Sequence, residues 1–197
     1  MSEGGLLKGK SWYRNAGADN RRRLSKEARD VFSIKIKERL FALREYKEAD
    51  SVFCYMSLPD EVGTSLMLKS MLSDGKKISV PFVCGEGVME AVEVLSLDDV
   101  ETGKYGILTV KEEKRKIIDI KKLDCAIIPG TAFGRDCSRV GMGGGFYDRF
   151  LLRAGNAARI GVCFDCQLFE KLPVEKNDLF MDMVITENNV IYNEKGE

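Results

Sequence analysis

The stretch RVGMGGGFYDRF, residues 139–150, sets four glycines within five positions between an arginine and the start of an apolar run. Glycine lacks a side chain that would keep a ligand from the main chain, and it adopts positive φ angles at little cost. A glycine loop that opens a helix directs several backbone N–H groups at one point, where an anion can bind. A glycine cluster by itself is most often a turn. Arg139 and Asp148 on its two sides favour a nucleotide site, because a carboxylate beside phosphates suits Mg²⁺.

The loop fits neither of the two common nucleotide-binding fingerprints. A Walker loop requires Lys and then Ser or Thr after its last glycine, where this chain has Phe146 and Tyr147. A dinucleotide-binding fold has its glycines in the first strand–turn–helix unit, whereas these glycines lie in the last third of the chain. The residues therefore predict a phosphate-binding loop of no standard class.

The segments around the loop predict alternating strands and helices. Apolar runs predict strands at residues 51–55, 77–80, 88–95, 124–128, 159–164, 182–186 and 190–192. Apolar residues at three- and four-residue steps predict helices at residues 24–46, with Ser25 as N-cap, 64–72 and 146–153. We expect Pro81 to stop the second strand and residues 1–10 to be frayed. The alternation predicts an α/β fold with a mostly parallel sheet covered by helices on both faces.

Three loops follow predicted strands directly, at residues 56–63, 129–145 and 164–178. Ligands of parallel sheets bind beyond the carboxyl ends of the strands. We therefore expect these three loops to converge on one site, with the glycine loop as part of it.

The totals of the chain bound its class. A length of 197 residues predicts one domain spanning residues 1–197. The 31 basic and 31 acidic residues balance, so net charge gives no sign of a nucleic-acid partner. A solvated helix face is the expected reason for the early basic cluster, which comprises Arg21, Arg22, Arg23 and Lys26. No signal peptide and no apolar run long enough for a membrane are recognisable, which predicts a cytoplasmic protein.

The absence of histidine constrains any chemistry, because general acid–base catalysis near neutral pH most often uses that residue. Phosphoryl transfer fits this limit, since it depends mainly on positioning and on charge neutralisation. Among the six cysteines, Cys163 and Cys166 form a C-x-x-C pair. No second pair with metal-site spacing accompanies it, so we expect strand packing rather than a zinc or redox site.

Three candidate residues outside the loop each have two interpretations. Glu61 follows the first predicted strand, where its carboxylate could accept hydrogen bonds from a polar heterocycle or simply favour a helix N-terminus. Lys10 and Arg14 lie one helical turn apart and could clamp a phosphate. By themselves, however, these two residues favour a frayed basic terminus.

Two further carboxylates lie four residues apart near the end of the chain, in NDLFMD. Asp178 and Asp182 could join Asp148 around a metal ion. Alternatively, Asp182 could be a solvated residue at the start of a strand.

These features together resemble the 5-formyltetrahydrofolate cyclo-ligase family, also called 5,10-methenyltetrahydrofolate synthetase. Its most specific motif is a strand, a Pro-Gly turn, an apolar-Phe step, and an arginine leading into a glycine loop with two aromatics and Asp. Here this motif reads IIPGTAFGRDCSRVGMGGGFYDRFL, residues 127–151. Four further features match in order: Lys10 with Arg14 ahead of Ser25, Met56 with Glu61, IGVCFDCQL at 160–168, and LPVEKNDLFMDMVITE at 172–187. The resemblance covers nearly the whole chain.

The resemblance implies an enzyme, a ligase that closes the ring of 5-formyltetrahydrofolate to 5,10-methenyltetrahydrofolate with ATP and Mg²⁺ and releases ADP and phosphate. It also implies a three-layer α/β sandwich like those of sugar-phosphate isomerases and coenzyme A transferases. In the resemblance, Arg139 and Asp148 are the catalytic residues, Asp148 and Asp182 meet the metal, and Met56, Glu61 and Tyr147 line the folate pocket. ATP is then held by Lys10, Arg14, Arg139, Gly141, Met142, Gly143, Gly144, Gly145, Phe146 and Tyr147.

Three positions depart from the family pattern. Asn177 stands where many members carry His before Asp178, which makes a role for His there dispensable. Phe146 replaces the more usual Tyr, so one hydroxyl is missing. Gly17, in NAGADN at residues 15–20, falls where the family has a continuous helix, and glycine costs about 1 kcal/mol relative to alanine there. The placement of Lys10 and Arg14 depends on that helix.

The implied chemistry agrees with the residues. ATP can phosphorylate the formyl oxygen, which makes that oxygen a good leaving group, and the neighbouring N10 of the substrate can then close the ring. Both nucleophiles come from the substrate, so no protein nucleophile is required. A fold does not fix a function. The alternatives are a non-catalytic nucleotide- or folate-binding regulator and a phosphotransferase that acts on another N-acyl substrate.

Overall fold

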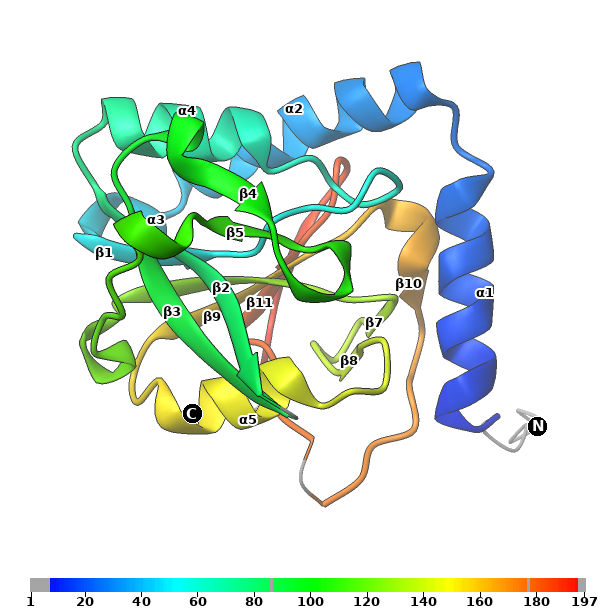
Figure 1. Ribbon diagram of the computed structural model, residues 1–197. Coiled ribbons are helices and arrows are strands. Elements are labelled where there is room, and N and C mark those ends of the chain that lie inside the picture. The colour runs from blue at the N-terminus through cyan, green and yellow to red at the C-terminus, as the bar shows by residue number, and fades with distance from the viewer. Residues whose placement is uncertain (1–7, 86, 177, 195–197) are drawn as a thin grey trace, which may run out of the picture.

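A seven-stranded sheet forms the centre of the computed structural model, which describes residues 8–85, 87–176 and 178–194 (Figure 1). The strand order is β12-β11-β9-β6-β1-β2-β3. The five inner strands run parallel to one another, and the two edge strands β3 and β12 are antiparallel to them. The predicted α/β class with a mostly parallel sheet is therefore confirmed.

The strands of this sheet lie close to the runs that the sequence predicts. Their bounds are β1 Ser51–Cys54, β2 Lys77–Gly85, β3 Val88–Val94, β6 Cys125–Pro129, β9 Ala158–Val162, β11 Met183–Ile185 and β12 Val190–Tyr192. A second sheet has three short strands, β7 Ala132–Gly134, β8 Arg139–Val140 and β10 Leu168–Phe169. A two-stranded ribbon joins β4 Val100–Thr102 to β5 Leu108–Val110.

Helices cover both faces of the central sheet (Figure 1). The α-helices are α1 Lys10–Arg22, α2 Lys26–Ala42, α3 Arg44–Glu48, α4 Ser65–Ser73 and α5 Phe146–Arg153. Short 3-10 turns occupy η1 Leu97–Asp99, η2 Lys104–Gly106, η3 Glu112–Lys114, η4 Ile120–Lys122 and η5 Asp165–Gln167. In Figure 1, α2 and α4 lie above the sheet, α5 lies below it, and α1 stands beside its right-hand end.

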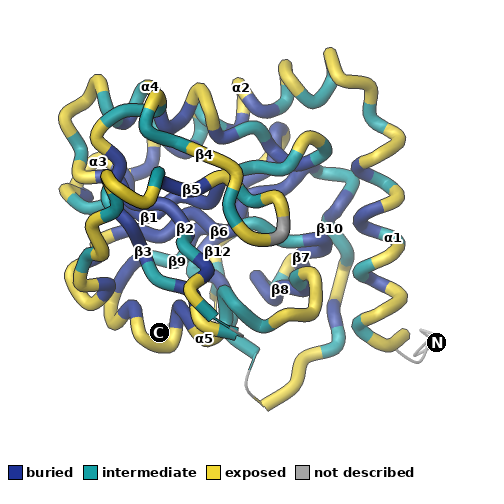
Figure 2. The backbone as a smooth tube through the Cα atoms, in the orientation of Figure 1, coloured by how far each residue is buried: buried dark blue, intermediate teal, exposed yellow. Residues whose placement is uncertain are grey.

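Side chains of each buried strand alternate between two apolar cores. On β1, Val52 and Cys54 belong to the core that includes residues of α2 and α4, whereas Phe53 belongs to the core that includes α5. On β6, Ile127 and Ile128 divide in the same way. This alternation follows from the two-residue period of a strand, and it explains why central strands read as continuous apolar runs. Figure 2 shows these strands as the buried interior of the molecule.

Two predicted boundaries are wrong. Strand β2 continues through Pro81 to Gly85. Strand β1 pairs with β2 only as far as Ser79, so Pro81 has a sheet neighbour on one side only, and a residue without an N–H is tolerated there. The long predicted helix is broken at Leu43, whose extended backbone (ψ 144°) separates α2 from α3.

The start of the chain agrees in part with its prediction. Ser25 caps α2, because its hydroxyl accepts a hydrogen bond from the Ala28 N–H at 3.1 Å. Most of the stretch expected to be frayed, residues 1–7, lies outside the described residues. Among the described residues, no helix has the length and apolar character that crossing a bilayer requires.

Candidate active site

A cavity of about 280 Å³ opens beyond the carboxyl ends of β1 and β6, beneath the glycine loop. Most of its wall is apolar. The carboxyl groups of Glu61 and Asp148 and the guanidinium of Arg139 converge on it. The lining residues are Tyr55, Met56, Leu58, Glu61, Val83, Met89, Ile107, Pro129, Gly130, Thr131, Arg139, Met142, Gly144, Gly145, Phe146, Tyr147 and Asp148. An apolar pocket with a few converging polar groups is typical of a ligand site.

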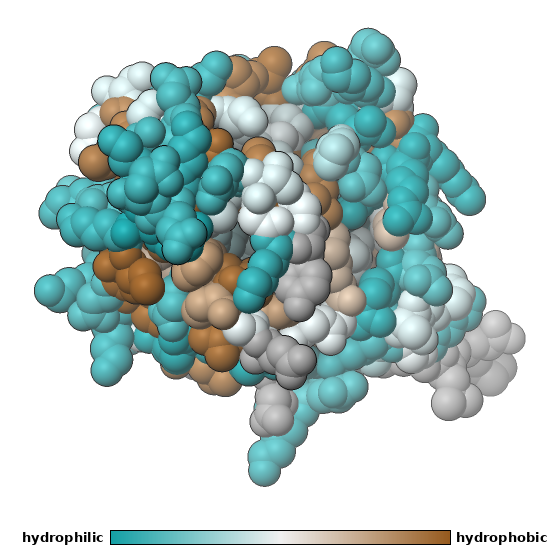
Figure 3. Space-filling view, in the orientation of Figure 1, coloured by the Kyte–Doolittle hydropathy of each residue, from teal (hydrophilic) through white to brown (hydrophobic). Residues whose placement is uncertain are grey.

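A larger and shallower groove of about 920 Å³ lies elsewhere, at the start of β6. Its walls come mainly from residues 118–124 and from the end of α5. In the view of Figure 3, hydrophobic residues gather at lower left, over β3 and α5, and further hydrophobic patches lie along the top. The groove lies at the strand ends opposite to the glycine loop, whereas the smaller cavity lies directly beneath that loop. We therefore take the smaller cavity as the candidate active site.

The two residues that bracket the glycine loop contact each other. Arg139 Nη2 donates a hydrogen bond to Asp148 Oδ1 at 2.6 Å, and Arg139 Nη1 donates to the carbonyl oxygen of Pro129 at 3.2 Å. The Arg139 side chain is only 3% exposed, and its buried Nε has no hydrogen-bond partner among the described residues. An unpaired buried guanidinium nitrogen is costly, which favours an anionic ligand at this point.

The glycine loop has the backbone conformation that its composition predicts. Gly143 and Gly145 have φ angles of 99° and 64°, in the left-handed region that favours glycine. Gly145 is the N-cap of α5, so the N–H groups of the first helical turn point toward the loop. Arg149 then donates hydrogen bonds to the carbonyl oxygens of Gly144 and Gly87, and thereby ties the loop to the β2–β3 hairpin. Contacts at both ends of the loop and with the β2–β3 hairpin therefore hold the loop in shape.

Helix α1 presents one face to this site. Lys10, Arg14, Gly17 and Arg21 follow one another at three- and four-residue steps, so they lie along one side of the helix. Arg14 Nε donates to the carbonyl oxygen of Gly141 at 2.8 Å, which places its guanidinium against the glycine loop. Lys10 Nζ instead donates to Asp178 Oδ1 at 2.7 Å. The helix is continuous through Gly17, as the family resemblance implies.

Gly17 has a physical reason in this helix. A Cβ atom at position 17 would lie 2.0 Å from the carbonyl oxygen of Thr131. Only glycine allows the helix to approach the wall of the cavity so closely. The intrinsic cost of a helical glycine is therefore offset by packing.

Glu61 lies in the floor of the cavity and is buried. Its Oε2 accepts a hydrogen bond from the Leu58 N–H at 3.0 Å, and its Oε1 accepts one from Arg21 Nη1 at 3.3 Å. Burial raises the pKa of the Glu61 carboxyl, while the Leu58 N–H and Arg21 act against that shift. Helix α4 begins only at Ser65, so Glu61 is not one of its first-turn carboxylates.

The aromatic and apolar residues named by the resemblance also reach the cavity. Met56 is buried and lines the wall. Phe146 and Tyr147 form the first turn of α5 at the cavity roof. Burial, together with the nearby Glu61, raises the pKa of Tyr147 far above its usual range, so its hydroxyl stays protonated.

Asp182 is not brought to the site. Its Oδ2 accepts a hydrogen bond from the Arg159 N–H at 2.7 Å, at the beginning of β11. The cavity lies at the level of Pro129, which pairs with Val162, three residues farther along β9 than Arg159. Three residues span about 10 Å along a strand, and β9 also separates β11 from β6. Asp148 and Asp182 therefore do not share one metal ion, and Asp182 is the strand-start residue of the alternative interpretation.

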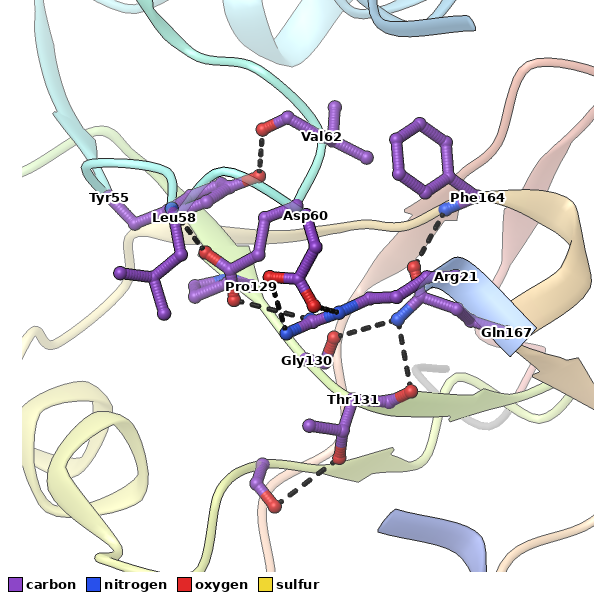
Figure 4. A network of polar contacts seen from close by, with 12 residues as sticks. Arg21, Tyr55, Leu58, Asp60, Val62, Pro129, Gly130, Thr131, Phe164 and Gln167 are labelled. Atoms are coloured by element: carbon purple, nitrogen blue, oxygen red, sulfur yellow. Dashed lines mark hydrogen bonds and ion pairs between the residues drawn. The ribbon is translucent and has the colours of Figure 1, made fainter. Parts of the chain in front are cut away.

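The convergence of the three loops is confirmed for two of them. Loops 56–63 and 129–145 line the cavity. Loop 164–178 supports it from behind: Gln167 Nε2 donates to the carbonyl oxygens of Gly130 and Thr131 at 3.1 and 3.0 Å, and Asp178 binds Lys10. Figure 4 shows Gln167 pointing at this turn.

Sequence reasoning missed several residues of the site. Val83, Met89 and Ile107 line the cavity from the β2–β3 hairpin and the segment beyond it, a region without a readable motif. Arg21 was expected on a solvated face, yet it is 3% exposed and binds Asp60 and Glu61. Its seven-residue spacing from Arg14 was the available signal, because that spacing places both on one helix face.

The C-x-x-C pair takes no part in the cavity. Cys163 and Cys166 are free thiols, as are the other four cysteines. Cys163 is buried in the core that includes α5, and burial raises its pKa well above the usual range. Both residues therefore behave as packing side chains.

Comparison with known proteins agrees with this geometry. The family model described as 5-formyltetrahydrofolate cyclo-ligase family matches residues 8–187. A protein of Schizosaccharomyces pombe named probable 5-formyltetrahydrofolate cyclo-ligase is 31% identical over 180 residues, which cover 83% of this chain and 88% of that protein. The 5-formyltetrahydrofolate cyclo-ligase of Escherichia coli is 28% identical over 174 residues, covering 86% of this chain and 96% of the relative.

Solved structures give the same result. The NMR structure of Aquifex aeolicus 5,10-methenyltetrahydrofolate synthetase superposes with a TM-score of 0.84 at 30% identity, covering 95% of this chain and 94% of that one. A Mycoplasma pneumoniae 5,10-methenyltetrahydrofolate synthetase, at 19% identity and a TM-score of 0.75, shows the same fold. From the family match, the relatives and the cavity beneath the glycine loop, we conclude that the chain belongs to the 5-formyltetrahydrofolate cyclo-ligase family and is an enzyme of the ligase class.

Proposed function

We propose that this chain closes the ring of 5-formyltetrahydrofolate to give 5,10-methenyltetrahydrofolate, with conversion of ATP to ADP and phosphate. The proposal assigns the folate ring system to the cavity beneath the glycine loop and the ATP phosphates to the loop itself. The observation that carries it is the joint placement of Glu61, Arg139 and Asp148 on one largely apolar cavity beneath a glycine loop.

The glycine loop supports the assignment of the phosphates. Backbone N–H groups at the start of α5, with Gly143 and Gly145 at positive φ, form an anion-binding concavity. Arg14 lies against the loop at Gly141, and the Arg139 guanidinium retains an unpaired N–H. Lys10, one turn before Arg14, adds a cation that is now paired with Asp178. Met142 is exposed on the loop and would cover the nucleotide.

The cavity itself supports the assignment of the folate. A pterin presents ring N–H and amino donors around an otherwise flat apolar body, and Glu61 offers a buried acceptor among apolar side chains. Two of the acceptor positions of the Glu61 carboxylate are used by Leu58 and Arg21. A carboxylate has about four such positions, so about two are left for a ligand. Met56 and Tyr147 supply walls on either side of the ring.

The reaction needs no protein nucleophile. The formyl oxygen attacks the γ-phosphorus of ATP, the bond from that phosphorus to the bridging oxygen of ADP breaks, and an iminium phosphate forms. N10 of the substrate then attacks the formyl carbon, its proton passes to solvent, and phosphate leaves with the former formyl oxygen. The protein's part is to hold the formyl oxygen in line with the γ-phosphate and to neutralise charge there.

Three side chains of the site have a part in that step. Arg139 lies where its guanidinium can stabilise the transferring phosphoryl group. Tyr147, whose hydroxyl burial keeps protonated, is available to the substrate as a hydrogen-bond donor and not as a base at neutral pH. Glu61 orients the pterin.

The residues present fit a magnesium ion that arrives with ATP. Mg²⁺ usually binds one or two carboxylates together with substrate phosphates and water. Asp148, whose side chain is 30% exposed beside the loop, is a carboxylate of that kind. When bound, the ion would neutralise phosphate charge during transfer. Asp148 would then divide its oxygens between the ion and Arg139.

One assay tests the proposal against both alternatives. The purified protein is incubated with 5-formyltetrahydrofolate, ATP and Mg²⁺, while methenyltetrahydrofolate is followed by its absorbance and phosphate by a coupled assay. We expect one phosphate for each methenyl product. Binding of both ligands without turnover would indicate a non-catalytic regulator. Phosphate release without the chromophore would indicate a phosphotransferase with another N-acyl substrate.

A further inference from the structure

Arg21 is a buried cation directly behind the cavity. Its side chain is 4% exposed, although it belongs to a basic run whose next residue, Arg22, is 63% exposed. Figure 4 shows Arg21 reaching from α1 toward Asp60 and the floor of the site. A charge this deeply buried persists only when it is paired and hydrogen-bonded.

The guanidinium of Arg21 divides its donors between two neighbouring carboxylates. Nε and Nη2 donate to the two oxygens of Asp60 at 3.0 and 3.3 Å, in the bidentate geometry that fixes both groups. Nη1 donates to Oε1 of Glu61 at 3.3 Å. The second Glu61 oxygen receives the Leu58 N–H. The carboxylate of Glu61 is thus fixed at both oxygens.

Arg21 is also the cation in contact with Glu61 within the described part of the chain. Asp60, Tyr55 and Tyr147 also face Glu61, and none of them carries positive charge. Arg139 lines the same cavity, but its guanidinium binds Asp148 and the carbonyl oxygen of Pro129. A buried carboxylate without a cation tends to take up a proton. A protonated carboxyl would present a donor where a pterin requires acceptors.

We propose that Arg21 is the positioning residue that keeps Glu61 oriented as an acceptor for the pterin, and that Asp60 holds Arg21 in place for this task. This inference rests on the proposed function. It assigns Arg21 no contact with substrate, because Arg21 does not line the cavity. Helix α1 then has two roles. It places Arg14 at the glycine loop and, two turns later, Arg21 against Glu61 in the floor of the cavity.

A purely structural role makes a different prediction. If Arg21 only ties α1 to residues 60–61, its loss should loosen the whole helix, and Arg14 and Lys10 should move with it. The Michaelis constants (KM) for ATP and for folate would then rise together. A positioning role affects folate binding alone, so the ratio of the two changes separates the two roles.

The test compares Arg21→Gln and Arg21→Lys with the matched control Arg23→Gln, which alters an exposed arginine of the same run. We expect Arg21→Gln to raise the KM for 5-formyltetrahydrofolate by about tenfold, the effect of losing one hydrogen bond to a charged group. The KM for ATP should stay within about twofold, as expected for a site that is not coupled to Arg21. Arg21→Lys should recover part of the folate affinity, and Arg23→Gln should behave like the parent.

A double-mutant cycle gives a sharper readout. In the background of Glu61→Gln, the further change Arg21→Gln should alter the KM for folate by less than about twofold, because the residue through which Arg21 acts is already changed. Equal fold-changes in both backgrounds would overturn the inference, as would an unchanged KM for folate in Arg21→Gln. If Arg21→Gln does not fold, Arg21→Lys decides by the same comparison of KM for folate and for ATP.

The failure of this inference differs from the failure of the proposed function. If the parent protein forms no methenyl product, the proposed function fails. If the parent forms product and the folded Arg21 variants bind folate normally, the proposed function stands and the role of Arg21 is overturned.

Discussion

Arg139 and Asp148 form an ion pair that links the two ends of the glycine loop, with 2.6 Å between Arg139 Nη2 and Asp148 Oδ1. The ion pair joins strand β8 to the first turn of α5, and the loop of residues 141–145 lies between them. The same two side chains border the cavity. The shape of the loop and, under the proposed function, the phosphate chemistry depend on this one pair of residues, which makes Asp148 the first residue to test.

Asp148→Asn should lower turnover far more than it weakens folate binding, because a carboxylate beside Mg²⁺ neutralises charge that grows during phosphoryl transfer. The measurement is kcat at saturating ATP and Mg²⁺, with folate affinity determined by titration. Asparagine can still accept a hydrogen bond from Arg139, so the loop should remain closed. Near-normal turnover with a stability loss of at most about 1 kcal/mol would identify Asp148 as a helix-start residue only.

Valine at Gly143 or Gly145 should raise the KM for ATP or abolish activity in a folded protein. Both glycines have positive φ, and a Cβ at Gly145 would lie 2.7 Å from an Arg149 nitrogen. The matched control is Gly75→Val, which carries the same backbone strain at φ 75° but has nothing within 4 Å and lies at the end of α4. Normal ATP affinity in both loop variants would place the nucleotide elsewhere.

Gly17→Ala should destabilise the protein by about 1–3 kcal/mol as an overpacked contact, even though alanine favours an isolated helix by about 1 kcal/mol. The added methyl would meet the Thr131 carbonyl oxygen at 2.0 Å. Displacement of α1 should also raise the KM for ATP through Arg14. The control is Gly9→Ala, where a Cβ has open space. A rise in the melting temperature of Gly17→Ala would contradict the packing account.

The sequence predicted the sheet well because each buried strand is a short apolar run between turn residues. Which of the two cores a given side chain joins cannot be predicted from such a run. Val52 and Phe53 are both apolar, yet they face opposite sides of the sheet. Pro81 misled the prediction because its effect depends on whether a neighbouring strand needs its N–H, which is a property of the sheet and not of the segment.

The residues of the site also fall into those that the sequence predicted and those that it did not. Local chemistry marked the glycine loop, Arg139 and Asp148, because glycine at positive φ and paired charges leave a trace in the sequence. Arg21 left only its seven-residue spacing from Arg14, because its partners Asp60 and Glu61 lie 39 and 40 residues away. Asp182 was carried over by resemblance, and the register of β11 against β9 places it at the other end of the strands.

The double substitution Cys163→Ala with Cys166→Ala should keep the specific activity of the folded fraction. Burial raises the pKa of Cys166 to about 11, so its thiol stays protonated and reacts slowly at neutral pH. Alkylation with iodoacetamide should therefore reach the exposed Cys84 first and become faster at Cys166 as the pH approaches 11. If the double variant lost activity but still bound ATP, a redox or metal role for the pair would be favoured again.

Calorimetric titration of Glu61→Gln with each ligand tests the assignment of this cavity to folate most directly. The amide brings N–H donors where the pterin requires acceptors, and losing a hydrogen bond to a charged group costs about 1.5–3 kcal/mol, roughly 10- to 150-fold in affinity. We expect the dissociation constant for 5-formyltetrahydrofolate to rise by about that factor, and the constant for ATP to stay nearly unchanged. Unchanged folate affinity would place the pterin away from Glu61, and equal weakening of both ligands would reveal a folding defect instead of a folate contact.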